Sequence, residues 1–318
     1  MEYMQRCLFC YEPLEDDRRD YHAACSRKMY GSSEPPELPY AEEDLEALAL
    51  QVIRKQVTIT GVQPKLSVDI EKTAPRHRRF TIVGVWGAYI LKPPTAQYPF
   101  LPEVEDLTMH LASLARIPVV PHALIRMRSG SLAYITKRID RHENGKLHME
   151  DMCQLTERLT EYKYHGSHEQ IARTIQKYSA NPGLDVLGFY EQVLFAFLTG
   201  NADMHLKNFS LLDRPGIGYA LAPGYDFVAT ALVNPGDTEE LALTLNGKKR
   251  HLRRKDFDAA FDRAGMEKKV ANSVYAKFEK AFPAWRSFIT TSFVPLEMQE
   301  RFLTLLDART EQLGLNPD

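Results

Sequence analysis

Hydrophobic and polar positions change their spacing near the middle of the chain. Over residues 57–92, β-branched and aromatic residues form short alternating stretches separated by turn residues, which predicts an antiparallel sheet. Residues 123–139 add two strands around the turn at Ser129 and Gly130. After Asp151 the apolar residues recur mainly every three or four positions, which predicts helices. The expected fold class is α+β, with a sheet-rich part followed by a helical part.

Helical spacing defines several segments. The predicted helices cover residues 42–55, 103–116, 168–178, 186–199, 255–264, 270–289 and 295–312. Residues 201–227 are the exception in the second half, with a polar loop and a short pair of strands. Turn formers at residues 31–39 predict a linker. We therefore expect three parts, which are residues 1–35, 36–145 and 146–318.

Composition and charge exclude several classes of protein. The 318 residues are 44% hydrophobic and 26% charged, as in ordinary soluble globular proteins. A formal net charge of −2 gives no overall field that would draw the chain to nucleic acid or anionic lipid. No apolar stretch approaches the ~18 residues of a membrane span. We therefore expect a cytoplasmic location without a membrane partner.

One segment of the helical half interrupts its apolar pattern with polar residues. Asp203 and Asn208 lie five positions apart, and Asp226 follows the short strands. A kinase catalytic loop spaces its catalytic Asp and its metal-binding Asn in this way, and a second metal-binding Asp follows. Oxygen ligands of this kind suit Mg²⁺. Each residue alone is equally well explained as a cap of a helix or turn, so their order carries the prediction.

The sheet-rich half contains a lysine that could accompany these acidic residues in a kinase site. Lys92 ends a predicted strand behind three apolar residues, where a lysine could reach the phosphates of ATP. Glu103 and Glu105 of the next helix are candidates to pair with it, and Glu105 is preferred because it lies further into the helix. Upstream, Gly61 could place a turn over phosphates, although a single Gly between strands is usually only a turn or bulge.

Six segments in this order resemble the HipA-like kinase family. The resemblance is carried by the phrases Gly-Val-Gln-Pro-Lys-Leu, Ile-Leu-Lys-Pro, Met-Cys-Gln and Asn-Ala-Asp-Met-His-Leu-Lys-Asn-Phe, and it covers residues 57–312. The matching segments are Thr58–Lys65, Lys92, Tyr134–Arg141, His148–Gln154, Gly200–Leu211 and Leu221–Phe227.

The resemblance implies a two-lobed protein-kinase-like fold, with a sheet-rich N-lobe in residues 36–145 and a helical C-lobe in residues 146–318. It implies that Asp203 is the catalytic base or orienter, that Asn208 and Asp226 hold Mg²⁺, and that Lys92 steadies the ATP phosphates. The other implied ATP contacts are Thr60, Gly61, Val62, Gln63, Pro64 and Lys65 of the Gly-rich loop, Lys137, Arg138 and Ile139 of the interlobe stretch, and His205, Leu206, Lys207, Asn208, Tyr225 and Asp226.

The family phosphorylates Ser or Thr on proteins, including aminoacyl-tRNA synthetases, and its members autophosphorylate in the Gly-rich loop. The matching position here is Thr58, and Thr60 is a second candidate on the same side of the strand. A phosphate would add about −1.5 to −2 charges beside the phosphates of ATP, so we expect it to switch the enzyme off. Two threonines that merely favour a strand are the alternative.

The chain differs from full-length HipA because fewer than sixty residues precede this loop. A whole N-terminal subdomain is therefore expected to be absent, as in the short HipT form. In that arrangement a HipS-like protein supplies the subdomain and restrains the kinase, beside a HipB-like protein that binds DNA. The resemblance thus implies the toxin of a toxin–antitoxin system with HipS-like and HipB-like partners, which contacts DNA only indirectly.

The first residues carry a separate cluster of metal-ligand types. Cys7, Cys10, His22 and Cys25 form two short pairs whose spacing suits a structural Zn²⁺ site, although reduced cysteines can also simply pack in a small core. The basic run at residues 248–255 could contact a nucleic acid, but such a run is more often a solvated face.

Two other functions compete with the protein kinase. A small-molecule kinase of the aminoglycoside or lipid type would use the same Asp, Asn and Asp. A catalytically silent kinase-fold module would bind a partner without turnover of ATP.

Overall fold

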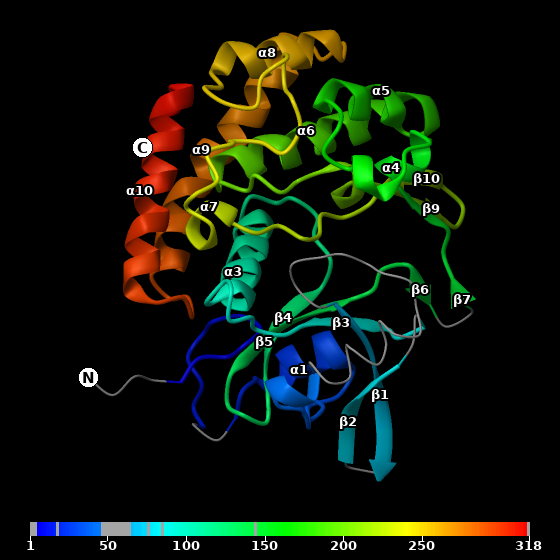
Figure 1. The fold of residues 1–318 in the computed structure, drawn as a ribbon, viewed down its shortest axis with the longest axis vertical. Coiled ribbons are helices and arrows are strands. Elements are labelled where there is room, and N and C mark those ends of the chain that lie inside the picture. Colours follow the sequence, from blue (N-terminus) through cyan, green and yellow to red (C-terminus); the bar gives the residue numbers. More distant parts are fainter. Residues whose placement is uncertain are drawn as a thin grey trace. The chain divides into compact units, whose positions relative to one another are not determined.

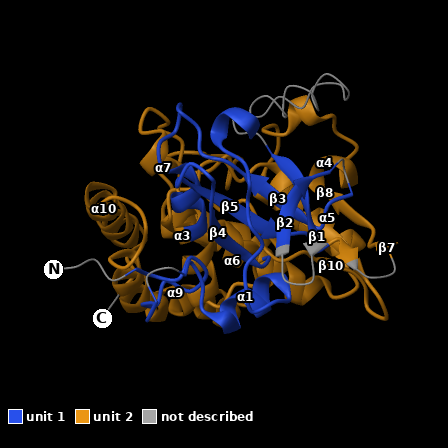
Figure 2. Cartoon of the chain, turned by 90° about the horizontal axis from the view of Figure 1, so that it is seen from below, with its two compact units in different colours: residues 1–106, 120–139 blue, residues 107–119, 140–318 orange. Residues whose placement is uncertain are grey.

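The structure is a computed structural model that describes residues 5–16, 19–45, 65–74, 77–83, 86–142 and 145–316. The chain divides into two compact units, which Figure 2 colours separately. Unit 1 comprises residues 1–106 and 120–139, and unit 2 comprises residues 107–119 and 140–318. The helix α3 (Leu101–Leu114) passes from one to the other, so that its residues 101–106 belong to unit 1. The three-part division of the chain stays a prediction.

A five-stranded antiparallel sheet is the centre of unit 1. Its strand order is β2 (His77–Ile82), β1 (Leu66–Ala74), β3 (Tyr89–Lys92), β5 (Leu132–Lys137) and β4 (His122–Arg126) (Figure 1). Of the three inner strands β1, β3 and β5, the strands β3 and β5 are buried along most of their length, as expected of strands with neighbours on both edges. The turn between β4 and β5 has Gly130 at φ 95°, a conformation that glycine adopts without steric cost.

A short helix, α1 (Ala23–Tyr30), packs on this sheet. Tyr30 at its end makes an edge contact with Phe80 at 5.8 Å between ring centroids. Gly31 ends the helix in the left-handed conformation, and its N–H donates to the carbonyl of Arg27. The sequence prediction missed this helix, although basic residues in the last turn followed by Gly are typical of a helix end.

Unit 2 is built around α6 (Pro182–Leu198), a helix that is apolar on nearly all sides. Every residue from Gln192 to Leu198 is buried, because neighbouring helices cover α6 on several faces. The surrounding helices are α5 (His168–Tyr178), α8 (Arg254–Arg263), α9 (Lys268–Ile289) and α10 (Leu296–Leu313), with the short α4 (Met152–Leu155) and α7 (Thr230–Val233) (Figure 1). Trp285 of α9 is fully buried and contacts Phe195 at 5.6 Å between ring centroids.

Small sheets complete unit 2. A three-stranded antiparallel sheet has the order β10 (Gly218–Leu221), β9 (Ser210–Arg214) and β8 (Met149–Asp151). A two-stranded pair joins β6 (Arg141–His142) to β7 (Gly145–Lys146). The turn η2 (Leu206–Asn208) directly precedes β9.

The predicted α+β fold class is confirmed, and so are the helices predicted at residues 103–116, 168–178, 186–199, 255–264, 270–289 and 295–312. The helix predicted at 42–55 is helical at 42–45, and the rest of it lies outside the described residues. Within the described ranges, no helix combines the length and apolar character that crossing a bilayer requires.

Candidate active site

Lys92 and Glu105 form a buried ion pair in unit 1. Lys92 is 3% exposed and Glu105 is fully buried, and the Lys92 ammonium donates to the Glu105 carboxylate. The ammonium also lies 5.3 Å from the ring centroid of Tyr134, its cross-strand neighbour on β5. The preference for Glu105 over Glu103 is confirmed. A lysine is tolerated in this apolar setting only because a charged partner accompanies it.

The end of β5 carries the residues predicted to meet adenine. Lys137 is the last residue of the strand and is exposed, and its N–H donates to the carbonyl of Pro121 at 2.8 Å. The N–H of Arg138 donates to the carbonyl of Ala88 at 2.9 Å, and Ile139 is half-buried. These bonds fix the backbone of the stretch within unit 1.

In unit 2, α6 leads directly into the loop that holds Asp203. Gly200 leaves the helix at φ 67°, and a Cβ atom at this position would lie 2.6 Å from a methyl group of Leu305. The left-handed conformation therefore favours glycine, and a larger residue would also displace the Leu305 side chain. The loop that follows rises from a rigid, buried helix, which is how catalytic loops are held in place.

Asp203 and Asn208 are connected through the backbone of this loop. The Asn208 amide nitrogen donates to the Asp203 carbonyl at 3.0 Å, and the Asp203 N–H donates to the side-chain oxygen of Asn201 at 3.1 Å. Because its nitrogen is used in this bond, Asn208 has its amide oxygen available for a metal. Asp203 is exposed, whereas Asn201 and Asn208 are buried.

Tyr225, Asp226 and Phe227 form the third part of the site. The Tyr225 hydroxyl lies 2.5 Å from the Ser210 hydroxyl and donates to the carbonyl of Lys207 at 3.1 Å. Phe227 is fully buried against Phe195, 5.1 Å between ring centroids. Between these anchors Asp226 has φ 57°, in the left-handed region that costs energy for a residue with a side chain. Such strain is typical of functional positions.

The remaining predicted contacts of unit 2 lie on η2 or directly before it. His205 and Leu206 are buried, and Lys207 is half-buried. The Lys207 ammonium pairs with the Asp151 carboxylate at 3.0 Å. Asp151 also caps α4 in a capping box with Gln154, which gives a physical reason for the Met-Cys-Gln motif.

Sequence reasoning missed Tyr164. Its hydroxyl donates to the Asp203 carboxylate at 2.6 Å, and its ring meets the His205 ring edge-on at 5.1 Å between centroids. Burial raises the pKa of Tyr164, so the phenol stays protonated and remains the donor. Nothing in the local sequence marks this residue, because the contact joins positions 39 residues apart.

The predicted Gly-rich loop is described only at its end. Lys65 is described and exposed, whereas Thr58, Thr60, Gly61, Val62, Gln63 and Pro64 lie outside the described residues.

Two other sequence features are placed by the structure. The ligand atoms of Cys7, Cys10, His22 and Cys25 all lie within 4.8 Å of one another. In the basic run, Lys248 pairs with the buried carboxylate of Asp256 at 2.8 Å, and Lys249 pairs with Glu239 at 3.2 Å, so both lysines have carboxylate partners within unit 2.

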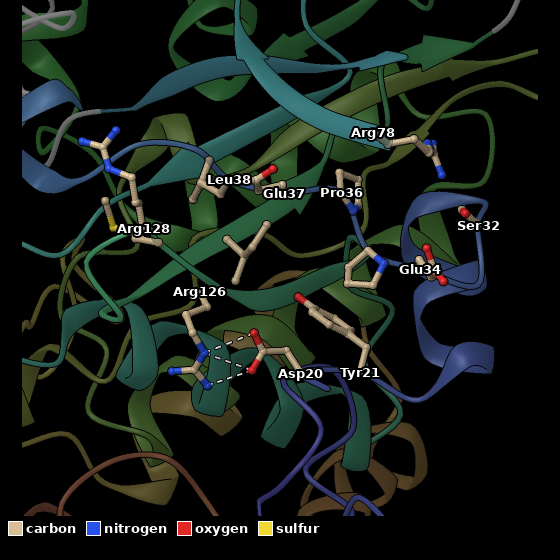
Figure 3. Close-up of a pocket in the computed structure, with 13 residues that line it drawn as sticks. Asp20, Tyr21, Ser32, Glu34, Pro36, Glu37, Leu38, Arg78, Arg126 and Arg128 are labelled. Carbon is tan, nitrogen blue, oxygen red and sulfur yellow. Dashed lines mark hydrogen bonds and ion pairs between the residues drawn. The ribbon is translucent and has the colours of Figure 1, made fainter. Parts of the chain in front are cut away.

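Unit 1 contains a cavity of about 490 Å³. Figure 3 shows the residues that line it, with the ion pair between Asp20 and Arg126 among them. Its walls come from residues 20–21, 32, 34–38 and 125–128 and from Arg78 of β2. None of the described residues that are predicted to contact ATP lines it.

Comparisons with known proteins match one family model and several curated relatives. The model of the HipA-like C-terminal domain matches residues 57–285. A Haemophilus influenzae protein named "Putative kinase" is 30% identical over 62% of this chain and 59% of its own length. "Putative kinase Y4mE" of Sinorhizobium fredii is 30% identical over 64% of this chain and 49% of its own length. The chain thus spans about half the length of the curated relatives it matches.

Two solved structures share the fold. The HipA chain from the complex of Shewanella oneidensis HipA, HipB and operator DNA has a TM-score of 0.68 at 21% identity, with 87% of this chain and 72% of that chain covered. The Helicobacter pylori proinflammatory kinase CtkA has a TM-score of 0.54 at 16% identity, covering 79% and 96%. The family model extends over more than half of the chain and includes Lys92, Asp203, Asn208 and Asp226, so the protein belongs to the HipA-like C-terminal domain family.

Proposed function

We propose that the chain is an ATP-dependent serine/threonine protein kinase and the toxin of a HipBST-like or HipBA-like toxin–antitoxin system. The observation that carries this proposal is the buried pair of Lys92 and Glu105. In kinases the corresponding Lys–Glu pair holds the lysine that binds ATP phosphates. The ordered loop of Asp203 and Asn208, followed by Asp226, supports the same activity.

Each residue has a distinct proposed role. Lys92 binds ATP phosphates, with Thr60, Gly61, Val62, Gln63, Pro64 and Lys65 covering them. Lys137, Arg138 and Ile139 contact adenine, and His205, Leu206, Lys207, Asn208, Tyr225 and Asp226 make the other nucleotide contacts. The available amide oxygen of Asn208 and the carboxylate of Asp226 are hard ligands that fit Mg²⁺, which neutralises phosphate charge when bound.

In the proposed reaction, Asp203 orients the hydroxyl of a Ser or Thr and accepts its proton. The bond between the γ-phosphorus and the bridging oxygen of ATP breaks, a bond from that phosphorus to the acceptor oxygen forms, and ADP leaves. Tyr164 is proposed as a positioning residue, because its hydroxyl holds one oxygen of the Asp203 carboxylate.

The proposal extends to the substrate and the partners. The acceptor is proposed to be an aminoacyl-tRNA synthetase, which places the enzyme in the cytoplasm. The antitoxins are proposed to be HipS-like and HipB-like proteins, with DNA bound only through the latter. The Shewanella oneidensis HipA was solved with HipB and operator DNA, which supports a partner of this kind.

Autophosphorylation is proposed at Thr58 or Thr60, as in a HipT-type kinase. A phosphate beside the proposed ATP phosphates repels them and so inactivates the enzyme.

The deciding experiment is transfer of radiolabel from [γ-³²P]ATP with Mg²⁺ to the purified chain and to cytosolic proteins, followed by mapping of the labelled sites. We expect label at Thr58 or Thr60 and on a protein acceptor, and neither label with Asp203→Asn. The matched control is Asp213→Asn on β9, which makes the same chemical change in unit 2 outside the proposed site. Absence of label from both the chain and cytosolic proteins contradicts the proposal.

The same assay separates the alternatives. Transfer only to aminoglycosides or lipids indicates a small-molecule kinase. Binding of a partner without any turnover of ATP indicates a silent module.

A further inference from the structure

The N-terminal cysteines and histidine converge on one point in unit 1. The Cys10 sulfur lies 3.4 Å and the Cys25 sulfur 3.8 Å from Nδ1 of His22. With Zn–S bonds of about 2.3 Å, two sulfur ligands of a tetrahedral Zn²⁺ lie about 3.8 Å apart, and a nitrogen ligand lies somewhat closer. The spacing of the four ligand atoms therefore suits a single ion at their centre.

His22 has the tautomer that a metal ligand needs. Its Nε2 lies 3.0 Å from the carbonyl oxygen of Pro13. A carbonyl only accepts hydrogen bonds, so Nε2 carries the proton and Nδ1 presents a lone pair toward the cysteines. Ligating histidines in metal sites are usually oriented by such a bond from the second ring nitrogen.

The backbone brings the two ligand pairs together. Tyr11 donates from its N–H to the carbonyl of Cys7 at 2.9 Å, which closes the turn between Cys7 and Cys10. His22 caps α1 and Cys25 lies in the first turn of this helix, so both side chains share one face. The N–H of His22 points to the Cys7 sulfur at 3.5 Å. Three cysteines and one histidine are the ligands of a closed structural zinc site.

This cluster is tied to α3 through Tyr11. The Tyr11 residue has φ 63°, and its hydroxyl donates to one oxygen of Asp106 at 2.8 Å. The other oxygen of Asp106 lies 2.6 Å from Nδ1 of His122 on β4. Tyr11 and Asp106 are buried, and Asp106 directly follows Glu105, the partner of Lys92.

A second connection holds the segment to the sheet. The N–H of Leu124 on β4 donates a hydrogen bond to the carbonyl of Leu8 at 3.0 Å. The Tyr21 hydroxyl donates a hydrogen bond to the carbonyl of Leu124. Asp20 forms a bidentate pair with Arg126 of the same strand, which Figure 3 shows. The N-terminal segment thus covers the edge strand β4 of the five-stranded sheet.

We propose that Cys7, Cys10, His22 and Cys25 bind a structural Zn²⁺, and that the ion fixes Tyr11 against Asp106 and thereby positions Glu105. Metal binding fixes the turn from Cys7 to Cys10, and Tyr11 is the next residue in the chain. Loss of the metal frees Tyr11 and weakens the first turns of α3. The metal site stands independently of the kinase proposal, whereas any consequence of the position of Glu105 for ATP binding by Lys92 rests on that proposal.

The first experiment measures metal content of the full chain by mass spectrometry and by the absorption of the Co²⁺-substituted protein. We expect about one Zn²⁺ per chain and the spectrum of a tetrahedral cobalt thiolate site. Cys25→Ser should lose most of the zinc, whereas Cys153→Ser, which changes the cysteine of unit 2, should retain it. A disulfide between Cys7 and Cys10, or equal zinc in both variants, overturns the metal site.

The second experiment follows amide hydrogen exchange of residues 101–107 before and after removal of zinc by a chelator. We expect exchange at least about tenfold faster without the metal, because the first turns of α3 then open more often. Tyr11→Phe should give the same increase while it retains zinc. Tyr21→Phe removes a hydroxyl of the same segment that contacts β4 instead, so it should leave α3 unchanged.

If hydrogen exchange in α3 is unchanged after removal of zinc, the ion does not position Glu105, even if zinc binds. Both readouts are independent of phosphotransfer. If the chain has no kinase activity but passes both tests, the proposed function fails and the metal site stands.

Discussion

Unit 1 and unit 2 hold their candidate active-site residues in opposite ways. Lys92 and Glu105 of unit 1 are charged groups enclosed by the sheet and α3, so each depends on the other to remain charged. Asp203 of unit 2 is exposed and is positioned by backbone bonds and by Tyr164. Stability and chemistry are therefore coupled in the first region and separable in the second.

The largest expected effect is on chemistry alone. Asp203→Asn should lower the rate of phosphotransfer by about 10²–10⁴-fold, the usual contribution of a positioned acid or base. Because Asp203 is exposed, the midpoint of urea unfolding should stay near that of the unmodified chain. A variant that retains the rate removes Asp203 from the proposed mechanism.

In unit 1 a single change should affect both properties. Glu105→Gln leaves Lys92 buried without its carboxylate, so we expect a loss of about 3–5 kcal/mol in the free energy of unfolding, together with loss of ATP binding. Urea unfolding and titration with nucleotide measure the two effects. Glu71→Gln, which breaks an exposed pair with Arg79, is the control and should change the midpoint little.

The double variant Lys92→Met, Glu105→Leu sharpens this test. It removes both charges and fills the space with apolar groups, so stability should largely return while ATP binding stays absent. Recovery of ATP binding in this variant contradicts the proposed role of Lys92.

Acid should expose a further feature of unit 2. His168 is fully buried against Phe209, and burial lowers its pKa to about 3. Between pH 6.5 and about 3 the unfolded chain takes up a proton that the folded chain does not, so stability falls as pH falls. From pH 7 to pH 5 this group should cost about 2 kcal/mol.

The unfolding free energies of the unmodified chain and His168→Leu at both pH values isolate this contribution. The loss should be smaller in His168→Leu and unchanged in His148→Leu, which alters an exposed histidine of the same unit. Burial raises the pKa of Glu103 in unit 1 to about 7. The folded chain therefore binds this proton before the unfolded chain does, so the contribution of Glu103 to stability rises as pH falls. Equal acid sensitivity of both histidine variants would count against a neutral buried His168.

The smallest expected effect tests how Asp203 is oriented. Tyr164→Phe removes one hydrogen bond to the carboxylate, so kcat should fall by about tenfold, with KM for ATP and stability nearly unchanged. Tyr162→Phe, two residues away and exposed, is the control. A fall in stability without a change in kcat would assign Tyr164 a purely structural role.

The sequence by itself determined most of the helices and strands and the order of Lys92, Asp203, Asn208 and Asp226. These features can be predicted from the sequence because helical and strand periodicity depend on residues that are close together in the chain. The spacing of Asp203 and Asn208 is also local, within one loop.

Only the tertiary structure decided which groups meet. It brought Tyr164 to Asp203 and Tyr11 to Asp106 across 39 and 95 residues, and it enclosed the pair of Lys92 and Glu105 that the sequence had already favoured. It also fixed the tautomer of His22 through the carbonyl of Pro13. Such contacts depend on packing between segments that are distant in the sequence. The spacing of residues along the chain therefore does not predict them.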